Sequence, residues 1–175
     1  MANILIIYSS TDGQTIKICQ KLQEVIEQQA HRVKMISIQH EPQVELAFFD
    51  KIVIGASIRY GKHSPLIIDF IKKNERILTE KSNAFFSVNV VARKPDKNQP
   101  ETNPYMQKFL KQISWHPKKL AVFAGKLDYP RYGFFDRLAI RLIMLMGNGP
   151  TNPHAVVEFT DWQQVEAFGQ VISAM

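Results

Sequence analysis

The segment from Asn3 to Thr15 places the strongest constraint on what this chain folds into, because a buried strand runs there directly into a polar turn. Ile4 to Tyr8 are five consecutive apolar or aromatic residues, with the length and β-branched content of a strand that is covered on both faces. Ser9 to Thr15 then bring four hydroxyl groups, one carboxylate and one glycine into a single turn, and a helical pattern starts directly behind it. A strand, a tight turn and a helix in this order are typical of an α/β fold.

The turn at the end of this strand is a candidate anion site. The first amides of a helix have no partner within the helix, and the positive end of the helix dipole favours a negative ligand such as a phosphate. The turn lacks both the G-x-x-x-x-G-K-[ST] pattern of a P-loop and the G-x-G-x-x-G pattern of a dinucleotide fold. Because a carboxylate aimed at a phosphate would repel it, we expect Asp12 to turn away and cap the helix. An ordinary capped turn without a ligand stays open as the alternative.

Strands and helices alternate along the rest of the chain. Apolar residues at helical spacing predict helices over Gln14 to Gln29, Pro65 to Leu78 and Thr102 to Trp115, and a last helix that Asp161 caps and that runs to Ile172. Apolar runs predict strands over Val33 to Ile38, Lys51 to Ala56, Asn83 to Val91 and Leu120 to Ala124. On the second helix we expect an inner face of Leu66, Phe70, Ile71 and Leu78. The alternation predicts a doubly wound α/β fold, in which a mostly parallel five-stranded sheet has helices on both faces.

Length and composition fit one domain over residues 1 to 175. A chain of 175 residues that is 45% hydrophobic buries a sizeable core without splitting. The only cysteine, Cys19, falls on the helical face of Leu22, Val25 and Ile26, so we expect a core residue and no disulfide within the chain. No apolar run approaches the roughly 18 residues that a spanning helix needs, and no cleavable signal sequence is recognisable. We therefore expect the protein in the cytosol or on the cytosolic face of a membrane.

Two further loops are expected beside the first turn, because ligands bind at the carboxyl ends of parallel strands. The second loop, Ser57 to His63, combines an aromatic residue, a glycine and three potential cations. The third loop, Asn89 to Pro95, has a polar tip and two more cations. We expect His63 to be a solvent-exposed loop residue rather than a general base.

The net charge of +6, from 22 basic and 16 acidic residues, favours anionic partners such as lipid, nucleic acid or an acidic substrate. Nucleic acid is the least favoured of these, because the basic loops carry no aromatic platform for stacking bases. The five histidines are scattered without metal-ligand spacing, so no metal site is expected. The chain also lacks the G-x-S-x-G elbow of many hydrolases.

An insertion from Gly125 to His154 separates the fifth strand from the last helix. Its central part, Phe134 to Met146, is strongly apolar, with Arg137 and Arg141 one helical turn apart. At about 1.5 Å per residue a helix of this length reaches only about 20 Å, which is too short to span a bilayer. It is suited to lie in a membrane interface with its arginines reaching lipid phosphates. Packing on its own domain and a dimer contact remain the alternatives.

The first turn resembles the phosphate loop of the flavodoxins, whose pattern is [ST]-x-T-G-x-T. Ser10, Gly13 and Thr15 match this pattern, whereas Asp12 stands where a threonine is usual. The resemblance implies a flavodoxin-like sheet of order 2-1-3-4-5, with the insertion near strand 5, and FMN as cofactor. It implies that the phosphate is held by Ser10, Thr11, Asp12, Gly13, Gln14 and Thr15. The two later loops then flank the isoalloxazine ring through Ser57, Ile58, Arg59, Tyr60 and Gly61 on one side and Asn89, Val90, Val91, Ala92 and Arg93 on the other.

Longer segments carry a more specific resemblance. The chain resembles the flavodoxin-like family of quinone-dependent bacterial protoporphyrinogen IX oxidases over FSVNVVARKPDKNQPETNPYMQKFL, AGKLDYPRYGFFDRLAIRLIMLM and EFTDW. The resemblance implies an oxidoreductase of haem biosynthesis, in which noncovalent FMN takes six electrons from protoporphyrinogen IX by successive hydride transfers to give protoporphyrin IX. It also implies menaquinone or ubiquinone as acceptor. The protein is then peripheral on the cytoplasmic face of the inner membrane, where Phe134 to Met146 contacts an anionic membrane surface.

Four cations of the later loops are candidates for binding the two propionates of this macrocycle: Arg59, Lys62, Arg93 and Lys94. No catalytic side chain is identified, so the flavin is expected to carry the chemistry. Two other functions stay open, a soluble FMN electron carrier and an NAD(P)H quinone reductase. The oligomeric state does not follow from the sequence.

Overall fold

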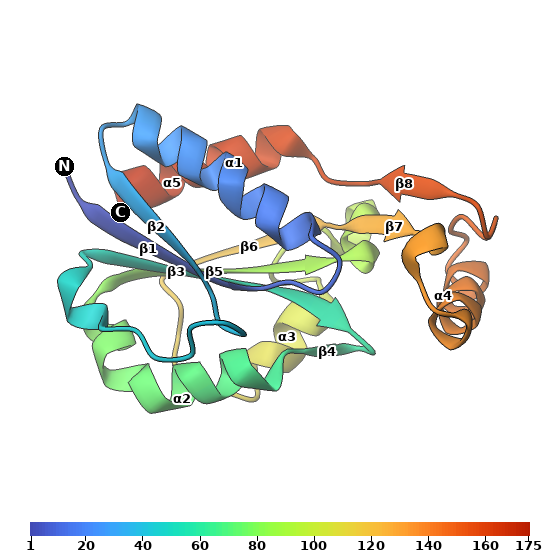
Figure 1. Ribbon diagram of the computed structural model, residues 1–175, viewed down its shortest axis with the longest axis horizontal. Coiled ribbons are helices and arrows are strands. Elements are labelled where there is room, and N and C mark those ends of the chain that lie inside the picture. Colours follow the sequence, from blue (N-terminus) through green and yellow to red (C-terminus); the bar gives the residue numbers. More distant parts are fainter.

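The computed structural model describes residues 1–175 and has a parallel sheet as its central layer (Figure 1). Its main strands are β1 (Asn3–Ser9), β2 (Arg32–Ser37), β3 (Lys51–Arg59), β5 (Ser82–Asn89) and β6 (Lys119–Ala124). They pair in the order β2-β1-β3-β5-β6, and every one of these pairings is parallel. The two-residue strand β4 (Lys62–His63) pairs antiparallel with the end of β3. Without β4 the order is 2-1-3-4-5, so the predicted flavodoxin-like sheet is confirmed.

Two layers of helices cover the sheet. The helices α1 (Gln14–Gln28) and α5 (Trp162–Ala174) lie on one face, and α2 (Pro65–Glu80) and α3 (Pro104–Leu110) lie on the other (Figure 1). Alternate residues of β1 therefore enter different cores: Ile4 and Ile6 pack toward α1 and α5, whereas Leu5 and Ile7 pack toward α2 and α3. The prediction for Cys19 is confirmed, because this thiol is fully buried in the first of these cores.

The insertion forms a small subdomain beyond the carboxyl ends of the strands, at the opposite end of the molecule from both termini (Figure 1). It contains β7 (Lys126–Asp128), which pairs antiparallel with β8 (Val156–Glu158), and the helix α4 (Phe134–Met146) between them. Leu127, Tyr129 and Met144 form its own buried cluster. The predicted helix Phe134 to Met146 is thus present with the predicted bounds. None of the helices, α4 included, combines the length and the apolar character needed to cross a bilayer.

Four short 3-10 turns complete the chain, and two of them shape the loops at the carboxyl ends of the strands. They are η1 (Leu46–Phe48), η2 (Val90–Arg93), η3 (Pro95–Lys97) and η4 (Tyr129–Arg131). The strand that was predicted to reach Val91 ends at Asn89, because the Asn89 side chain accepts a hydrogen bond from the Ala92 amide at 3.1 Å and starts η2. The third loop therefore begins as a capped turn.

Two predictions for helices on the second face were wrong in detail. Leu66 is 45% exposed, and Ile67 takes its place on the inner face of α2, because Ile67, Ile71 and Leu78 share one stripe of a helix that starts at Pro65. The helix predicted over Thr102 to Trp115 is limited to α3. Beyond it the chain leaves helical geometry and places Ile113 and Trp115 in the core.

Candidate functional site

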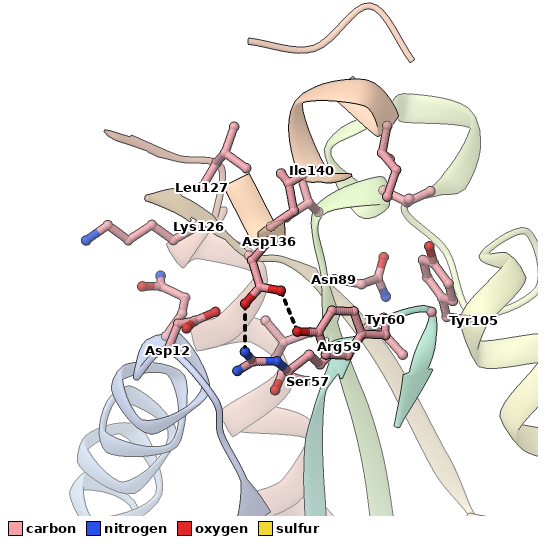
Figure 2. A pocket seen from close by; sticks show the side chains of 18 of the residues that line it. Asp12, Ser57, Arg59, Tyr60, Asn89, Tyr105, Lys126, Leu127, Asp136 and Ile140 are labelled. Atoms are coloured by element: carbon pink, nitrogen blue, oxygen red, sulfur yellow. Dashed lines mark hydrogen bonds and ion pairs between the residues drawn. The ribbon is translucent and has the colours of Figure 1, made fainter. Parts of the chain in front are cut away.

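A cavity of about 440 Å³ lies at the carboxyl ends of the strands, where the three loops predicted from the sequence meet the insertion (Figure 2). Its volume is within the range of about 300 to 1,000 Å³ that is usual for sites of small molecules and cofactors. Predicted site residues that line it are Ser10, Asp12, Gln14, Thr15, Ser57, Ile58, Arg59, Tyr60, Gly61, Asn89, Val90 and Val91. Predicted residues that do not line it are Thr11, Gly13, Lys62, Ala92, Arg93 and Lys94.

The first turn presents polar groups that the protein itself leaves without partners. Gly13 is the N-cap residue of α1, with φ of 89°, and its amide donates to the Ser10 hydroxyl at 3.1 Å. The Thr15 hydroxyl and the Gln14 carbonyl oxygen Oε1 are buried without a hydrogen-bond partner. The Gln14 amide group is held in place, because its Nε2 donates to Glu158 at 2.7 Å and to Thr160 at 2.9 Å. Both unpartnered oxygens belong to cavity-lining residues, so the turn is built to contact a polar ligand.

The prediction that Asp12 caps α1 was wrong. The N-cap position is occupied by Gly13, and no side chain makes a capping hydrogen bond there. A left-handed backbone conformation suits glycine at this position, so the helix starts one residue later than a capping Asp12 requires. Asp12 instead lines the cavity, and its backbone carbonyl accepts from Arg131 at 3.2 Å.

Replacing one aspartate at the start of each of the helices α1 and α5 tests which of the two helices is capped by a side chain. Asp161 does cap α5, since it accepts from the amides of Gln163 and Gln164. We expect Asp161→Ala to cost about 1 kcal/mol of unfolding free energy, the usual value of a lost cap. Asp12→Ala should change it by less than about 0.5 kcal/mol, as for other surface substitutions. Chemical denaturation of the ligand-free protein measures both, and an equal loss in the two variants would contradict the assignment of the caps.

The second loop is a tight hairpin between β3 and β4. Its two central residues, Tyr60 and Gly61, have φ of 51° and 72°, as a two-residue hairpin of this twist requires. Tyr60 is 72% exposed and lines the cavity. Its exposure places an aromatic ring at the cavity mouth, where an apolar ring system of a ligand can pack against it.

The third loop rests on a buried polar network. Ser87, Asn89 and Asn103 are all buried, and Asn89 donates to Ser87 at 3.1 Å while Asn103 donates to Asn89 at 3.0 Å. His63 closes the network, because its Nε2 lies 2.8 Å from the Ser87 hydroxyl. The prediction of an exposed His63 was therefore wrong: β4 folds back along β3 and turns the ring inward, where it packs edge-on against Phe85 and Phe109. Burial, with a smaller contribution from the charge of Lys108, lowers the pKa of His63 to about 4.

The buried imidazole predicts an acid-sensitive fold. The pKa of His63 is near 6.5 in an unfolded chain and about 4 here, so the unfolded state binds more protons between these values and stability falls as the pH drops. We expect the unfolding free energy to decrease by about 2 to 3 kcal/mol from pH 7 to pH 4 through this residue. Denaturation as a function of pH should show a clearly smaller decrease for His63→Gln. His116→Gln is the control, because His116 is exposed and its replacement should leave the dependence of the unfolding free energy on pH as in the wild type.

The fourth wall of the cavity comes from the insertion and was missed by sequence reasoning. Residues of β7, of the turn after it and of α4 line the cavity. They are Lys126, Leu127, Tyr132, Asp136, Ala139, Ile140, Ile143 and Met144. Figure 2 shows Asp136 above the second loop, with its carboxylate turned toward the side chains of Arg59 and Tyr60. Arg59 donates to Asp136 at 3.0 Å, and the Tyr60 hydroxyl also donates to this carboxylate. The helix that the sequence marks as a candidate membrane contact therefore also closes the cavity.

The remaining predicted cations do not line the cavity. Arg93 donates to the backbone carbonyls of Val90 at 3.2 Å and Gly147 at 3.0 Å, so it ties the end of α4 to the third loop. Lys62 is exposed on β4, and neither it nor Lys94 lines the cavity. Of the four cations proposed for propionate binding, the structure brings only Arg59 to the cavity.

The arginines of α4 donate to backbone carbonyls of the insertion. Arg137 donates to the carbonyls of Tyr129 and Tyr132, each at 3.2 Å, and Arg141 donates to the carbonyl of Thr151 at 2.8 Å. These contacts use part of the donors of each guanidinium group, and a contact of the remaining donors with lipid phosphates stays a prediction. The outer face of the helix is apolar, with exposed side chains of Phe134, Phe135, Leu138, Leu142, Leu145 and Met146.

Comparisons with known proteins agree on one family. A family model described as a flavodoxin domain matches residues 5–154. Protoporphyrinogen IX dehydrogenase [quinone] from Escherichia coli (strain K12) is 41% identical over 169 residues, which cover 97% of this chain and 93% of that protein. The protein of the same name from Leishmania major is 41% identical over 172 residues, which cover 98% of this chain and 74% of that protein.

Solved structures share the fold at much lower identity. Oxidised flavodoxin 1 from Bacillus cereus has a TM-score of 0.58 and 16% identity, with 98% of this chain and 97% of that chain covered. A flavone reductase has a TM-score of 0.54 and 14% identity, with 98% of this chain and 62% of that chain covered. The shared architecture thus extends over nearly the whole chain.

Proposed function

The chain belongs to the flavodoxin-domain family and, within it, to the quinone-dependent protoporphyrinogen IX dehydrogenases, and from this membership we propose that its cavity is where FMN binds and protoporphyrinogen IX is oxidised. The protein is an FMN-dependent oxidoreductase that converts protoporphyrinogen IX to protoporphyrin IX with a quinone as acceptor. The conversion removes six electrons and six protons, so three quinones are reduced for each macrocycle.

The residues of the cavity fit FMN. The buried Thr15 hydroxyl, the Ser10 hydroxyl and the first amides of α1 can hold the phosphate, and the unpartnered Gln14 carbonyl can accept from a hydroxyl of the ribityl chain. The exposed Tyr60 ring on the second loop and the backbone of Val90 and Val91 on the third can contact the isoalloxazine ring. Bound there, FMN supplies reversible two-electron chemistry, which lets one site serve the donor and the acceptor in turn.

The side chains around the cavity contribute positive charge and an apolar wall that excludes water. Arg59 and Lys126 both line it and can attract the carboxylates of an acidic substrate. Ile140, Ile143 and Met144 supply an apolar wall, which suits a hydrophobic macrocycle and excludes water. His63 lies outside the lining and is neutral at physiological pH, so it holds Ser87 and the third loop rather than moving a proton in the cavity.

The outer face of α4 supports a place on the cytoplasmic face of the inner membrane. Seven large apolar side chains of this one short helix are exposed, and six of them lie outside the cavity lining. An apolar surface of this extent marks an interaction site rather than isolated surface residues. Protoporphyrinogen and quinones partition into bilayers, and the same helix lines the cavity with its inner face. We therefore propose that α4 lies in the interface of an anionic membrane, with its outer face toward the acyl chains.

An anaerobic turnover assay tests the catalytic proposal. Purified protein loaded with FMN should form fluorescent protoporphyrin from protoporphyrinogen IX when menaquinone or ubiquinone is added, and the FMN-free protein should form none. An electron-carrier flavodoxin would show no quinone-dependent product, and a quinone reductase would reduce quinone at a comparable rate from NAD(P)H without porphyrinogen. Absence of flavin-dependent product under these conditions would refute the proposal.

A further inference from the structure

The carboxylate of Asp136 occupies a position at the cavity mouth where a second carboxylate would find the same partners. Asp136 lies on the first turn of α4, yet its partners Arg59 and Tyr60 lie 77 and 76 residues earlier in the chain (Figure 2). We infer that Asp136 is an internal stand-in for a carboxylate of the macrocycle, which replaces it on Arg59 and Tyr60 when the porphyrinogen binds. The inference rests on the proposed function. It assigns to Arg59 and Tyr60 the recognition of a macrocycle whose carboxylates are free rather than esterified.

The volume of the cavity sets where the macrocycle can bind. About 440 Å³ is in the lower part of the range for sites that hold one drug-sized molecule, so FMN leaves no room for a tetrapyrrole beside it. The macrocycle must therefore approach at the mouth, between α4 and the second loop. Asp136, Arg59 and Tyr60 form a polar bridge between α4 and the second loop. Ile140 and Ile143 of α4 line the same cavity.

Arg59 is suited to exchange one carboxylate for another. Its side chain is 48% exposed and that of Asp136 is 24% exposed, so the pair is reached by solvent and is held only moderately. A guanidinium group binds carboxylates through a fork of donors, and the Tyr60 hydroxyl adds another. Arg59 keeps an anionic partner before and after the exchange, whereas the displaced Asp136 carboxylate, already 24% exposed, has to be taken up by solvent.

The exchange does not require α4 to detach. Arg137 holds the helix to the carbonyls of Tyr129 and Tyr132, and Arg93 holds its carboxyl-terminal end through Gly147. Met144 anchors its inner face in the cluster with Leu127 and Tyr129. Only the Asp136 side chain has to leave Arg59, and a rotation of its side-chain torsions is enough for that.

Binding of the reaction product to the FMN-loaded protein tests the inference without turnover. Protoporphyrin IX is titrated under anaerobic conditions, and its Soret absorption reports the dissociation constant. We expect Asp136→Asn to bind protoporphyrin IX about threefold to tenfold more tightly than the wild type, as removal of a partly exposed competing charge predicts. Protoporphyrin IX dimethyl ester, which lacks free carboxylates, should bind both proteins equally. Asp69→Asn, an exposed change on α2, is the matched control and should leave both constants unchanged.

Combining Arg59→Gln with Asp136→Asn gives a double-mutant cycle for the binding of the free acid. In Arg59→Gln the affinity for the free acid should fall to that for the ester, and adding Asp136→Asn should then have no further effect. Unchanged or weaker binding of the free acid by Asp136→Asn, or an equal gain for the ester, would overturn the inference. These outcomes are distinct from failure of the proposed function, which would appear as a lack of quinone-dependent turnover by the wild type.

Discussion

Replacing Thr15 by valine is expected to weaken FMN binding by about 10- to 100-fold and to leave the free protein at least as stable as before. The Thr15 hydroxyl is buried at the first turn of α1 and has no partner in the protein. A hydrogen bond to a charged group is worth about 1.5 to 3 kcal/mol, which corresponds to this loss of affinity when the phosphate loses its donor. In the ligand-free protein the same change removes an unsatisfied polar group and keeps the shape, so it is neutral or stabilising.

Two measurements separate these effects. Quenching of flavin fluorescence gives the dissociation constant of FMN, and thermal unfolding of the FMN-free protein gives its stability. Thr11→Val is the matched control, because Thr11 belongs to the same turn but is exposed and does not line the cavity. It should leave the FMN affinity within about twofold. An unchanged affinity in Thr15→Val would show that the phosphate binds elsewhere. An equal loss in both variants would contradict the specific role of the Thr15 hydroxyl.

Most of the fold follows from the sequence because its periodicities are strong and local. The apolar run of β1, the alternation of strands and helices, and the bounds of α4 each depend on residues that are close together in the chain. The position of the cavity follows as well, since parallel strands bring their carboxyl ends to one edge. Sequence reasoning thus identified the three loops that line the cavity, although the part that each residue plays in binding stays a prediction.

The contacts between distant segments did not follow from the sequence. His63 was expected in solvent because loop histidines usually are, yet two residues of antiparallel pairing turn it into the core. Arg93 was expected to bind a ligand, but its guanidinium group donates to Gly147, 54 residues away. The helix α4 is apolar on both faces, so its pattern alone does not show which face closes the cavity. Asp136 is the one acidic residue in that apolar helix, and this was the available signal.

The triple variant Phe135→Ser, Leu138→Ser and Leu142→Ser is expected to abolish binding of the protein to vesicles of anionic phospholipid. These residues form one exposed stripe of α4 and do not line the cavity, so FMN affinity should stay at the wild-type value. Burial of a large apolar side chain contributes about 1.5 to 3 kcal/mol. Even at the low end, three losses lower the partition coefficient about a thousandfold.

Sedimentation with vesicles measures this partition, and the matched control is Phe48→Ser. Phe48 is 75% exposed, but it precedes β3, at the amino ends of the strands, so its replacement should not change vesicle binding if the helix is the contact. A dimer contact through the same stripe gives a different result. The wild type would then sediment as a dimer and stay off the vesicles, while the triple variant would be monomeric. Dimeric wild-type protein without affinity for vesicles would refute the membrane proposal, because the apolar stripe can be covered only once.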